Sequence, residues 1–476
     1  MNLQFNQKKA LNPYLPSWEY VPDGEPHVFG DRVYVYGSHD FFNGWVFCLG
    51  DYVCWSAPLN DLSDWRYEGV IFKRTDDPIN EDGRMVLYAP DVCQGPDGRY
   101  YLYYFYDKRS CINVAVSDKP EGPFVFYGRV RDDEGGLVGE RYGDEPYFDP
   151  AVLVEGNYVY LYGGFCGHGD KSRTGCMVTV LDARDMLTLV EEPAFVIPGN
   201  CYSTGTGYEG HEFFEAPSIR KIGEKYYLVY SSSRMCELCY AVSDSPDEDF
   251  EYKGCIVSNN DIGIDSYKPA DKPTAYGGNN HGGLVKLGED WYIFYHRQTN
   301  GTWYSRQGCA EKITIEEDGT IPQVEMTSCG LSESPLEGRG FIPAYIACNL
   351  FVKKGMSPIV AMGSGSDAIP RITQDGRDGD EEPGYITGIR DGVTAGFKYL
   401  DIKGVRTVSV ITRGYGDGSF EFSTSIGGRS LGSVEVSNTN YWEKFTAPIK
   451  IKDGVTAIYV TYKGGGSPSL LGFVLE

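Results

Sequence analysis

Five polar residues recur along the chain at a nearly constant spacing. They are Asp23, Asp91, Asp149, Glu215 and His281, and successive members are 68, 58, 66 and 66 positions apart. Carboxyl groups that converge can divide acid and base roles, because repulsion and burial raise some of their pKa values while others stay ionised. Four carboxylates and one imidazole in one place would have the composition of an active site.

Each polar residue precedes an aromatic-rich run by about eight to ten positions. The runs are Arg-Val-Tyr-Val-Tyr (32–36), Arg-Tyr-Tyr-Leu-Tyr (99–103), Asn-Tyr-Val-Tyr-Leu-Tyr (157–162), Lys-Tyr-Tyr-Leu-Val-Tyr (225–230) and Asp-Trp-Tyr-Ile-Phe-Tyr (290–295). A repeat of this length cannot bury its own strands, so the repeats must stack or close into a ring. Helical periodicity is almost absent. The pattern predicts an all-β fold in which five four-stranded units form a five-bladed β-propeller, with the polar residues near its axis.

The character of the chain changes after about residue 330. Residues 332–340 have the composition of a linker, and the remainder is rich in Gly and Ser, with short alternating strands expected at 407–412, 419–423, 433–436 and 457–462. Such strands with frequent turns are typical of a β-sandwich. We therefore predict a catalytic propeller over residues 1–335, followed by a jelly-roll-like β-sandwich over residues 336–476.

Charge and cysteine content limit the partners and the compartment. The net charge of −24 argues against nucleic acid and anionic membranes as partners, since both favour basic surfaces. No apolar run approaches the length of a membrane span, and the amino-terminal residues lack a stretch of signal-peptide length. With 13 cysteines, an odd number, these features favour a reducing cytoplasm.

Two motifs resemble metal sites without completing them. Cys236 and Cys239 form a CxxC in a strand-like segment, but no second pair stands at zinc-ligand spacing. The run from His211 to Glu215 begins like a zinc-protease motif, but its fifth residue is Glu where a His is required. Neither motif predicts a metal or redox centre.

Three of the acidic residues stand at or near a proline. Asp23 lies in Val-Pro-Asp-Gly-Glu-Pro-His, Asp91 in Tyr-Ala-Pro-Asp-Val and Glu215 in Phe-Phe-Glu-Ala-Pro. Proline stiffens the backbone, which suits a chain that drops into a central channel. Opposite walls of such a channel can hold two carboxyl groups roughly 6.5–9.5 Å apart, the separation that inverting glycoside hydrolysis requires. Capping of turns is the alternative role for any single one of these side chains.

The same segments resemble glycoside hydrolase family 43. The resemblance is carried by Tyr88-Ala-Pro-Asp91-Val, Phe148-Asp149-Pro150, Glu215-Ala-Pro217, Asn280-His281-Gly282-Gly283 and Trp291-Tyr-Ile-Phe-Tyr-His296-Arg297. It covers about residues 12–330. The motifs follow the order and spacing of the predicted blades, and each lies at the same place in its blade. The resemblance implies an inverting enzyme acting on α-L-arabinofuranosyl or β-D-xylosyl linkages.

The resemblance also implies roles for the carboxylates. Asp23 matches the general base, although the family more often has Ala-Asp-Pro there, so Glu25 is a rival. Asp91 matches the carboxylate that orients the acid and raises its pKa, and Glu215 matches the general acid. Asp149 is expected to contact a sugar hydroxyl or to support the channel.

Three further residues are candidates for substrate contact. His281 matches a central histidine that in some members contacts a calcium ion or its waters. Because calcium prefers oxygen ligands, a water-mediated contact or a purely substrate-binding role is an equal alternative. Arg297 is expected to donate to sugar hydroxyls or to form an ordinary salt bridge. Trp45 follows the first aromatic run and is a candidate for stacking on a sugar face. No cofactor is expected for the chemistry itself.

The carboxyl-terminal part resembles a family 6-like carbohydrate-binding module at Ile342–Asn349 and Asn440–Trp442, but lacks the usual ending. A scaffold packed against the propeller is an equal alternative to a sugar-binding domain. We expect a cytoplasmic glycosidase that removes terminal pentoses from short plant-derived oligosaccharides. The alternatives are a non-catalytic sugar-binding propeller and an enzyme acting on a β-galactan linkage.

Overall fold

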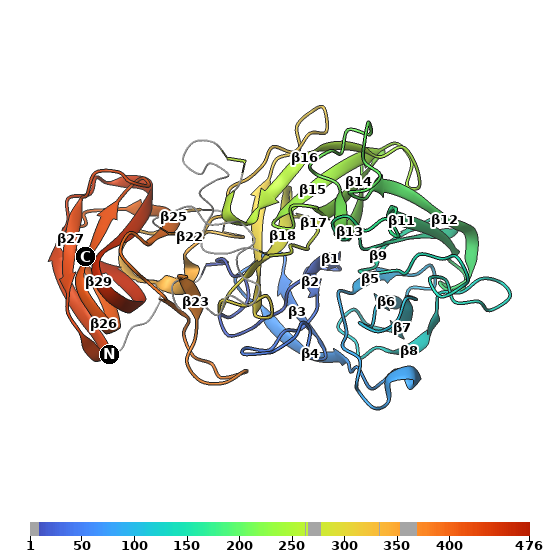
Figure 1. The fold of residues 1–476 in the computed structure, drawn as a ribbon, viewed down its shortest axis with the longest axis horizontal. Helices are drawn as coiled ribbons and strands as arrows, with labels where there is room; N and C mark the ends of the chain where they lie inside the picture. The colour runs from blue at the N-terminus through green and yellow to red at the C-terminus, as the bar shows by residue number, and fades with distance from the viewer. Residues whose placement is uncertain (1–8, 262, 265–277, 333, 353–368) are drawn as a thin grey trace.

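The computed structural model describes residues 9–261, 263–264, 278–332, 334–352 and 369–476. Its larger part is a β-propeller, seen on the right in Figure 1, and its smaller part is a second β domain on the left. The described residues contain three short 3-10 helices, η1 (Pro78–Asn80), η2 (Asn259–Asp261) and η3 (Ala344–Ile346). None of the described helices is long and apolar enough to cross a membrane.

Four blades of the propeller are four-stranded antiparallel sheets. They are formed by β1 (Glu25–Phe29), β2 (Arg32–Tyr36), β3 (Tyr52–Pro58) and β4 (Arg66–Phe72); β5 (Asp91–Gln94), β6 (Tyr100–Tyr104), β7 (Asn113–Ser117) and β8 (Val125–Arg129); β9 (Ala151–Glu155), β10 (Tyr158–Gly163), β11 (Gly175–Asp182) and β12 (Leu189–Pro198); and β13 (Phe213–Ile222), β14 (Lys225–Ser232), β15 (Glu237–Ser243) and β16 (Glu251–Ser258). The aromatic runs form strands, as the sequence predicted, and the structure places each of them second in its blade.

The fifth blade has three strands among the described residues, β17 (Leu284–Leu287), β18 (Asp290–Gln298) and β19 (Arg306–Ile313). The expectation of four strands in every blade is therefore wrong here. The amino-terminal segment lies beside β19 instead. Tyr14 N–H donates to Gly308 O (3.3 Å), and the Asn12 side chain donates to Ala310 O (3.0 Å) and accepts from Ala310 N–H (2.8 Å). These contacts join the two ends of the propeller chain.

Five apolar clusters fill the spaces between neighbouring blades. One of them, for example, packs Tyr34 and Tyr36 of blade one against Leu102 and Tyr104 of blade two. Four equivalent clusters join blades two and three, three and four, four and five, and five and one. Because each blade is covered on both faces, aromatic and β-branched residues occupy both sides of the inner strands. This arrangement closes the ring and fixes the positions of the inner strand ends.

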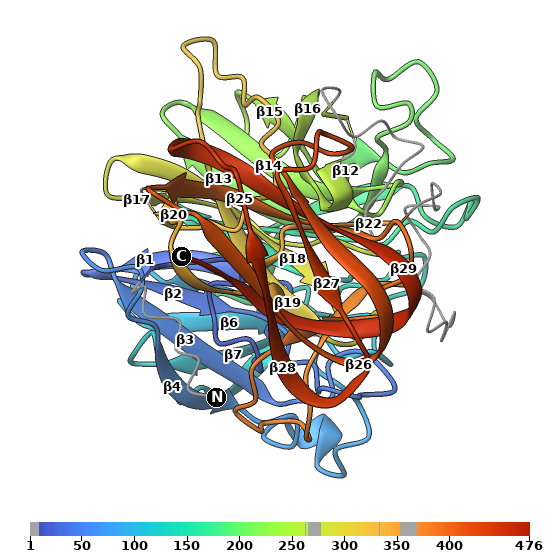
Figure 2. The ribbon, with the colours of Figure 1, turned by 90° about the vertical axis from the view of Figure 1, so that its left-hand side faces the viewer.

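The second domain is one ten-stranded sheet that curls around an apolar core (Figure 2). Its strands are β20 (Leu336–Glu337), β21 (Gly340–Pro343), β22 (Asn349–Phe351), β23 (Arg371–Thr373), β24 (Tyr385–Thr387), β25 (Thr394–Ile402), β26 (Thr407–Ser423), β27 (Gly432–Val436), β28 (Thr439–Pro448) and β29 (Gly454–Leu475). Two of the short strands expected from the sequence are joined in the long strand β26. Phe397, Phe422 and Phe473 lie at the centre of the core.

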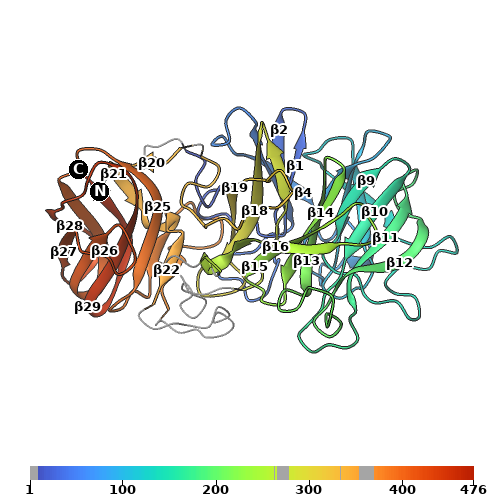
Figure 3. The same cartoon turned by 90° about the horizontal axis from the view of Figure 1, so that it is seen from above.

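The two domains pack directly against each other (Figure 3). Trp303 of blade five belongs to the apolar cluster of the second domain. Asp261 of the propeller accepts from the Asn349 amide (2.7 Å) and pairs with Lys398 Nζ (3.3 Å), and these side chains are buried. Apolar packing and buried polar contacts therefore join the two domains.

Candidate active site

A cavity of about 310 Å³ opens at the centre of the propeller. It is lined by Asp23, Phe47, Cys48, Tyr88, Ala89, Phe148, Asp149, Phe165, Phe214, Glu215, Met235, Asn279, Trp303 and Arg306. Three of the predicted carboxylates, Asp23, Asp149 and Glu215, therefore meet in one place. Asp91, His281, Arg297 and Trp45 are not among the lining residues.

The backbone presents the three carboxylates in a particular way. Asp23 and Asp149 each stand two residues before the first strand of their blade and have positive φ angles of 57° and 48°. Glu215 lies at an irregularity in β13, and the next residue, Ala216, has a φ of 64°. Left-handed conformations are costly for residues other than glycine and persist where the surrounding fold imposes them. Here they turn the carboxylates toward the cavity.

Asp23 is held in its ionised form. Arg306 Nη1 lies 2.8 Å from Asp23 Oδ1, and the His296 imidazole lies 3.3 Å from the same oxygen. Burial acts to raise the pKa of Asp23, but Arg306, His296 and His281 outweigh it, so the pKa lies below its usual value. An ionised, buried carboxylate beside a cavity is suited to accept a proton from water.

Glu215 is held in its protonated form up to neutral pH. Burial and the nearby charge of Asp23 raise the pKa of Glu215 to about 7, although the Asn279 side chain acts in the opposite direction. Burial and repulsion from Glu215 and Asp23 also raise the pKa of Asp149 well above its usual range. The site thus contains one ionised carboxylate and a coupled pair that retains a proton, which is the division that acid–base catalysis needs.

Arg306 is the functional residue that the sequence analysis missed. Its guanidinium is buried and makes two hydrogen bonds to Asp40, at 2.8 and 3.0 Å, besides its contact with Asp23. The ring of Phe47 lies 4.9 Å from the guanidinium carbon. Arg306 begins the third strand of its blade, so it stands outside the periodic pattern of polar residues. The strand also contains Gln307, Glu311 and Lys312, so its local sequence does not distinguish Arg306 from the other polar residues.

Aromatic rings form one wall of the cavity. Tyr88 contacts Phe148, which contacts Phe165, which contacts Phe214, with ring centroids 5.1–5.5 Å apart. Flat apolar faces beside polar groups are suited to sugar rings, which have both apolar faces and hydroxyl edges. Trp45, the predicted stacking residue, is 78% exposed and lies outside this cavity.

Asp91 lies deeper in the propeller, away from the cavity. Its carboxylate accepts hydrogen bonds from Val92 N–H (2.7 Å) and Val152 N–H (2.8 Å), and it contacts His27 Nε2 at 2.7 Å. Asp91 is the first residue of β5, whereas Asp23 and Asp149 precede their strands by two residues. The residue of blade two that occupies the equivalent of Asp23 is Ala89, which does line the cavity. In blade two, the position that faces the cavity is therefore Ala89, two residues before the predicted Asp91.

Glu25, the rival of Asp23, is also outside the cavity lining. It pairs with Arg220 (2.9 Å) and accepts from the Ser218 hydroxyl (3.0 Å). His281 lies between the cavity carboxylates and Glu25. Its Nδ1 is 3.9 Å from both Asp23 and Asp149, and its Nε2 is 3.8 Å from Glu25 Oε1. Burial lowers the pKa of His281 to about 4, so the ring is neutral at neutral pH.

The donor atoms around His281 decide which form of a calcium ion could fit there. Within the described part of the chain, Glu25 Oε1 and His281 Nε2 are buried and have no hydrogen-bond partner. Calcium takes six to eight oxygen ligands, and this pair offers one oxygen and one nitrogen. The two groups therefore fit a hydrated ion, with water as most of its shell, and do not fit an all-protein calcium cage.

Arg297 connects the propeller to the second domain. Its guanidinium is buried and donates to Ala347 O (2.9 Å), Tyr345 O (2.6 Å) and the Gln307 side chain. Two of these partners belong to the second domain. Among the described residues, Arg297 neither lines the cavity nor forms a salt bridge, and its hydrogen bonds link the two domains.

Comparisons with known proteins identify the family of the chain. Residues 21–321 match the sequence model of Glycosyl hydrolases family 43, and the chain belongs to this family. A protein of Thermoclostridium stercorarium named Xylosidase/arabinosidase is 61% identical over 472 residues, which cover 98% of this chain and 99% of that protein.

Solved structures also resemble the chain. A family 43 beta-xylosidase/alpha-arabinofuranosidase from a compost metagenome, in complex with xylotriose in a calcium-free form, is 26% identical, with a TM-score of 0.50, and covers 65% of this chain and 96% of its own. A family 43 arabinoxylan arabinofuranohydrolase from Bacillus subtilis is 20% identical, with a TM-score of 0.53, and covers 98% of this chain and 97% of its own. The second similarity extends over both domains and concerns the fold alone.

Proposed function

We propose that this enzyme removes terminal α-L-arabinofuranosyl or β-D-xylosyl residues from short oligosaccharides by a single inverting displacement. The observation that carries the proposal is the pairing of an ionised Asp23 with a protonated Glu215 across one aromatic-lined cavity. The name of the relative that is 61% identical, Xylosidase/arabinosidase, supports both sugars equally.

Each side chain of the cavity then has a role. Glu215 protonates the departing glycosidic oxygen, and Asp23 takes a proton from the attacking water. Asp149, which is coupled to Glu215, keeps the proton on the pair up to neutral pH, in the role that the sequence analysis assigned to Asp91. Arg306 keeps Asp23 ionised and fixes its position.

The size of the cavity supports action at a chain end. Its volume of about 310 Å³ lies at the lower end of the range for small-molecule sites, roughly 300–1,000 Å³. A cavity of this size suits a terminal sugar better than the interior of a polymer. Rapid loss of viscosity from polymeric arabinan or xylan, without release of monosaccharide, would contradict this part of the proposal.

We also propose a metal site and a cellular compartment for this enzyme. A hydrated calcium ion, when bound, would be held by His281 and Glu25 and would supply positive charge beneath the carboxylates. A cytoplasmic location is supported by the 13 cysteines, since the described residues contain no disulfide bond.

The test is hydrolysis of 4-nitrophenyl α-L-arabinofuranoside and 4-nitrophenyl β-D-xylopyranoside by the wild type and by Glu215→Gln. We expect release from at least one substrate and its loss in the variant, and the better substrate identifies the preferred sugar. Turnover that is unchanged in Glu215→Gln would contradict the assigned mechanism. A wild type that leaves both substrates and natural pentose oligosaccharides intact would favour a non-catalytic sugar-binding propeller.

A further inference from the structure

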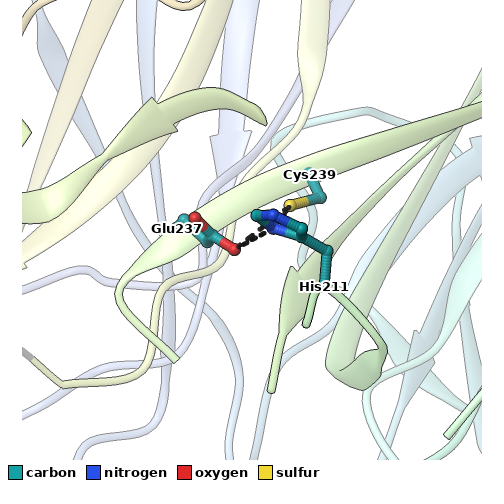
Figure 4. Close-up of side chains that lie close together, drawn as sticks. All are labelled: His211, Glu237 and Cys239. Atoms are coloured by element: carbon teal, nitrogen blue, oxygen red, sulfur yellow. Dashed lines mark hydrogen bonds and ion pairs between the residues drawn. The ribbon is translucent and has the colours of Figure 1, made fainter. Parts of the chain in front are cut away.

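Three side chains of blade four lie together outside the cavity. His211 Nδ1 is 2.6 Å from Glu237 Oε1, and Cys239 Sγ lies 3.6 Å from that nitrogen and 3.5 Å from that oxygen (Figure 4). The proposed hydrolysis uses none of the three. Imidazole nitrogen, carboxylate oxygen and thiolate sulfur are the donor types that hold Zn²⁺ in proteins.

The fold brings these donors together from distant segments. His211 ends the loop before β13, while Glu237 and Cys239 alternate on one face of β15. Cys255 of β16 is the direct cross-strand partner of Cys239, so its thiol adjoins the cluster. Of these four side chains, only the donor atoms of His211, Glu237 and Cys239 all lie within 4.8 Å of one another.

The distances are close to those of a tetrahedral zinc site. With Zn–N and Zn–O bonds of about 2.0 Å and Zn–S bonds of about 2.3 Å, ligand atoms lie about 3.5 Å apart for sulfur with nitrogen or oxygen, and about 3.3 Å apart for nitrogen with oxygen. Both sulfur separations in the cluster match the expected value. The nitrogen–oxygen separation of 2.6 Å is shorter because a hydrogen bond joins the two atoms. A metal ion that replaced this proton would need only a small opening of the pair.

The surroundings orient the donors and leave a way in. The Ser232 hydroxyl donates to Glu237 Oε1 (2.6 Å), and the Tyr252 ring stacks on the His211 ring with centroids 5.1 Å apart. Such outer contacts fix ligand orientation in zinc sites. Glu237 and Cys239 are buried, whereas the His211 side chain is 24% exposed and gives access from solvent. The nearby Arg234 is half exposed and 4.0 Å from Glu237, so it can turn away.

We propose that His211, Glu237 and Cys239 form a Zn²⁺ site, with a water molecule as the fourth ligand. The ion would tie the loop before β13 to the start of β15. His211 stands four residues before Glu215, and the β14–β15 turn contributes Met235 to the cavity wall. Bound zinc would therefore stabilise the wall that carries Glu215. The CxxC motif contributes only Cys239, which explains why motif spacing gave no zinc prediction.

Zinc binding must displace protons from the cluster. Hydrogen bonds to Cys239 and Glu237 raise the pKa of His211 to about 9, and burial raises the pKa of the Cys239 thiol well above its usual range. Imidazolium and thiol protons therefore pass to the buffer when the ion binds. We expect the affinity for zinc to increase as the pH rises.

The experiment titrates the full-length, reduced and metal-free protein with Zn²⁺ in competition with a chromophoric chelator. A parallel titration with Co²⁺ records absorption, because thiolate ligands give a charge-transfer band. We expect one equivalent of metal and a thiolate band. In Cys239→Ser and His211→Ala the thiolate band should be lost or changed, and the affinity should fall by at least about tenfold. Cys201→Ser, in the loop that leads to His211, is the matched control and should bind like the wild type.

Three results would overturn the proposal. They are the absence of stoichiometric binding, wild-type affinity in both cluster variants, and an equal loss of affinity in Cys201→Ser, which would indicate binding by scattered thiols. Thermal unfolding of each metal-free variant shows whether it is folded. If Cys239→Ser does not fold, the partly exposed His211→Ala decides the question. None of these readouts depends on glycosidase activity, so failure of this proposal is distinguishable from failure of the proposed function.

Discussion

Two levels of acidic side chains surround the axis of the propeller, and only one of them faces the cavity. Asp23, Asp149 and Glu215 form the upper level, which lines the cavity. Glu25 and Asp91 form the lower level, where Arg220, His27, Ser218 and backbone N–H groups bind their carboxylates. Convergence on the axis is therefore not enough to identify a catalytic carboxylate. Exposure to the cavity separates the chemical level from the structural one.

The difference between the levels comes from a shift of two residues. Glu25 and Asp91 are the first residues of β1 and β5, while Asp23 and Asp149 stand two residues before β1 and β9. A residue inside a regular strand is fixed by the ladder, whereas left-handed backbone in the turn before a strand, or at the irregularity of β13 that holds Glu215, can direct a side chain into the cavity. The levels can be distinguished experimentally with pairs of matched substitutions.

The largest effect is expected from the two glutamates. Glu215→Gln removes the proton donor, and we expect kcat to fall by about 10²- to 10⁴-fold on oligosaccharides, whose leaving groups need protonation. Glu25→Gln keeps a similar shape at the lower level and should retain most of the turnover. Steady-state kinetics on a pentose disaccharide measures both. Equal losses in the two variants would remove the distinction between the levels.

The next effect concerns the pH dependence of kcat/KM in variants of Asp149 and Asp91. Glu215 has a raised pKa of about 7, so kcat/KM of the wild type should fall as the pH rises through about 7, because the acid loses its proton. Asp149→Asn removes one of two coupled carboxylates. With less repulsion to hold the remaining proton, the alkaline limb should move to lower pH.

Asp91→Asn is the matched control for the pH experiment. The carboxylate of Asp91 binds His27 and two backbone N–H groups at the lower level, so its loss should leave the position of the alkaline limb unchanged. A shift in Asp91→Asn and none in Asp149→Asn would restore the role that the sequence assigned to Asp91.

A smaller effect is expected on stability. The Asp91 carboxylate accepts from two backbone N–H groups, and an asparagine at this position can satisfy only one of them with its oxygen. An unsatisfied buried donor costs about 1–3 kcal/mol, which corresponds to a decrease in melting temperature of roughly 2–4 °C for each kcal/mol. Calorimetry of Asp91→Asn and Asp149→Asn tests this difference. A larger decrease for Asp149→Asn would contradict the structural role of the lower level.

The fold was more predictable from the sequence than the depth of each side chain. The aromatic runs identified one strand in every blade, because strands covered on both faces need apolar residues on both sides, and only the structure shows that this strand is the second one. The three strands of blade five were not predicted, since the amino-terminal segment that lies beside β19 has no strand pattern of its own. The repeat predicted that Asp23, Asp149 and Glu215 would meet.

The repeat was less informative about Asp91 and Arg306. Asp91 fits the average spacing, but a shift of two residues is smaller than the variation between repeats, and only the structure identifies Ala89 as the cavity position. Arg306 lies on the third strand of its blade, outside the regular spacing of the polar residues at or before the first strands. Its importance comes from a distant contact with Asp23, which local patterns do not encode.

The smallest effect is expected at Trp45, and it tests how far the cavity extends toward the rim. Trp45 is 78% exposed, whereas Phe47, two residues later, lines the cavity and covers the Arg306 guanidinium at 4.9 Å. We expect Trp45→Ala to change KM by less than about twofold and Phe47→Leu to change it by about tenfold, since a cation–π contact between buried groups contributes up to about 2 kcal/mol. The comparison uses a disaccharide and a longer oligosaccharide. A large increase in KM for Trp45→Ala on the longer substrate alone would show that the sugar chain continues over the rim, and that the predicted stacking residue contacts it there.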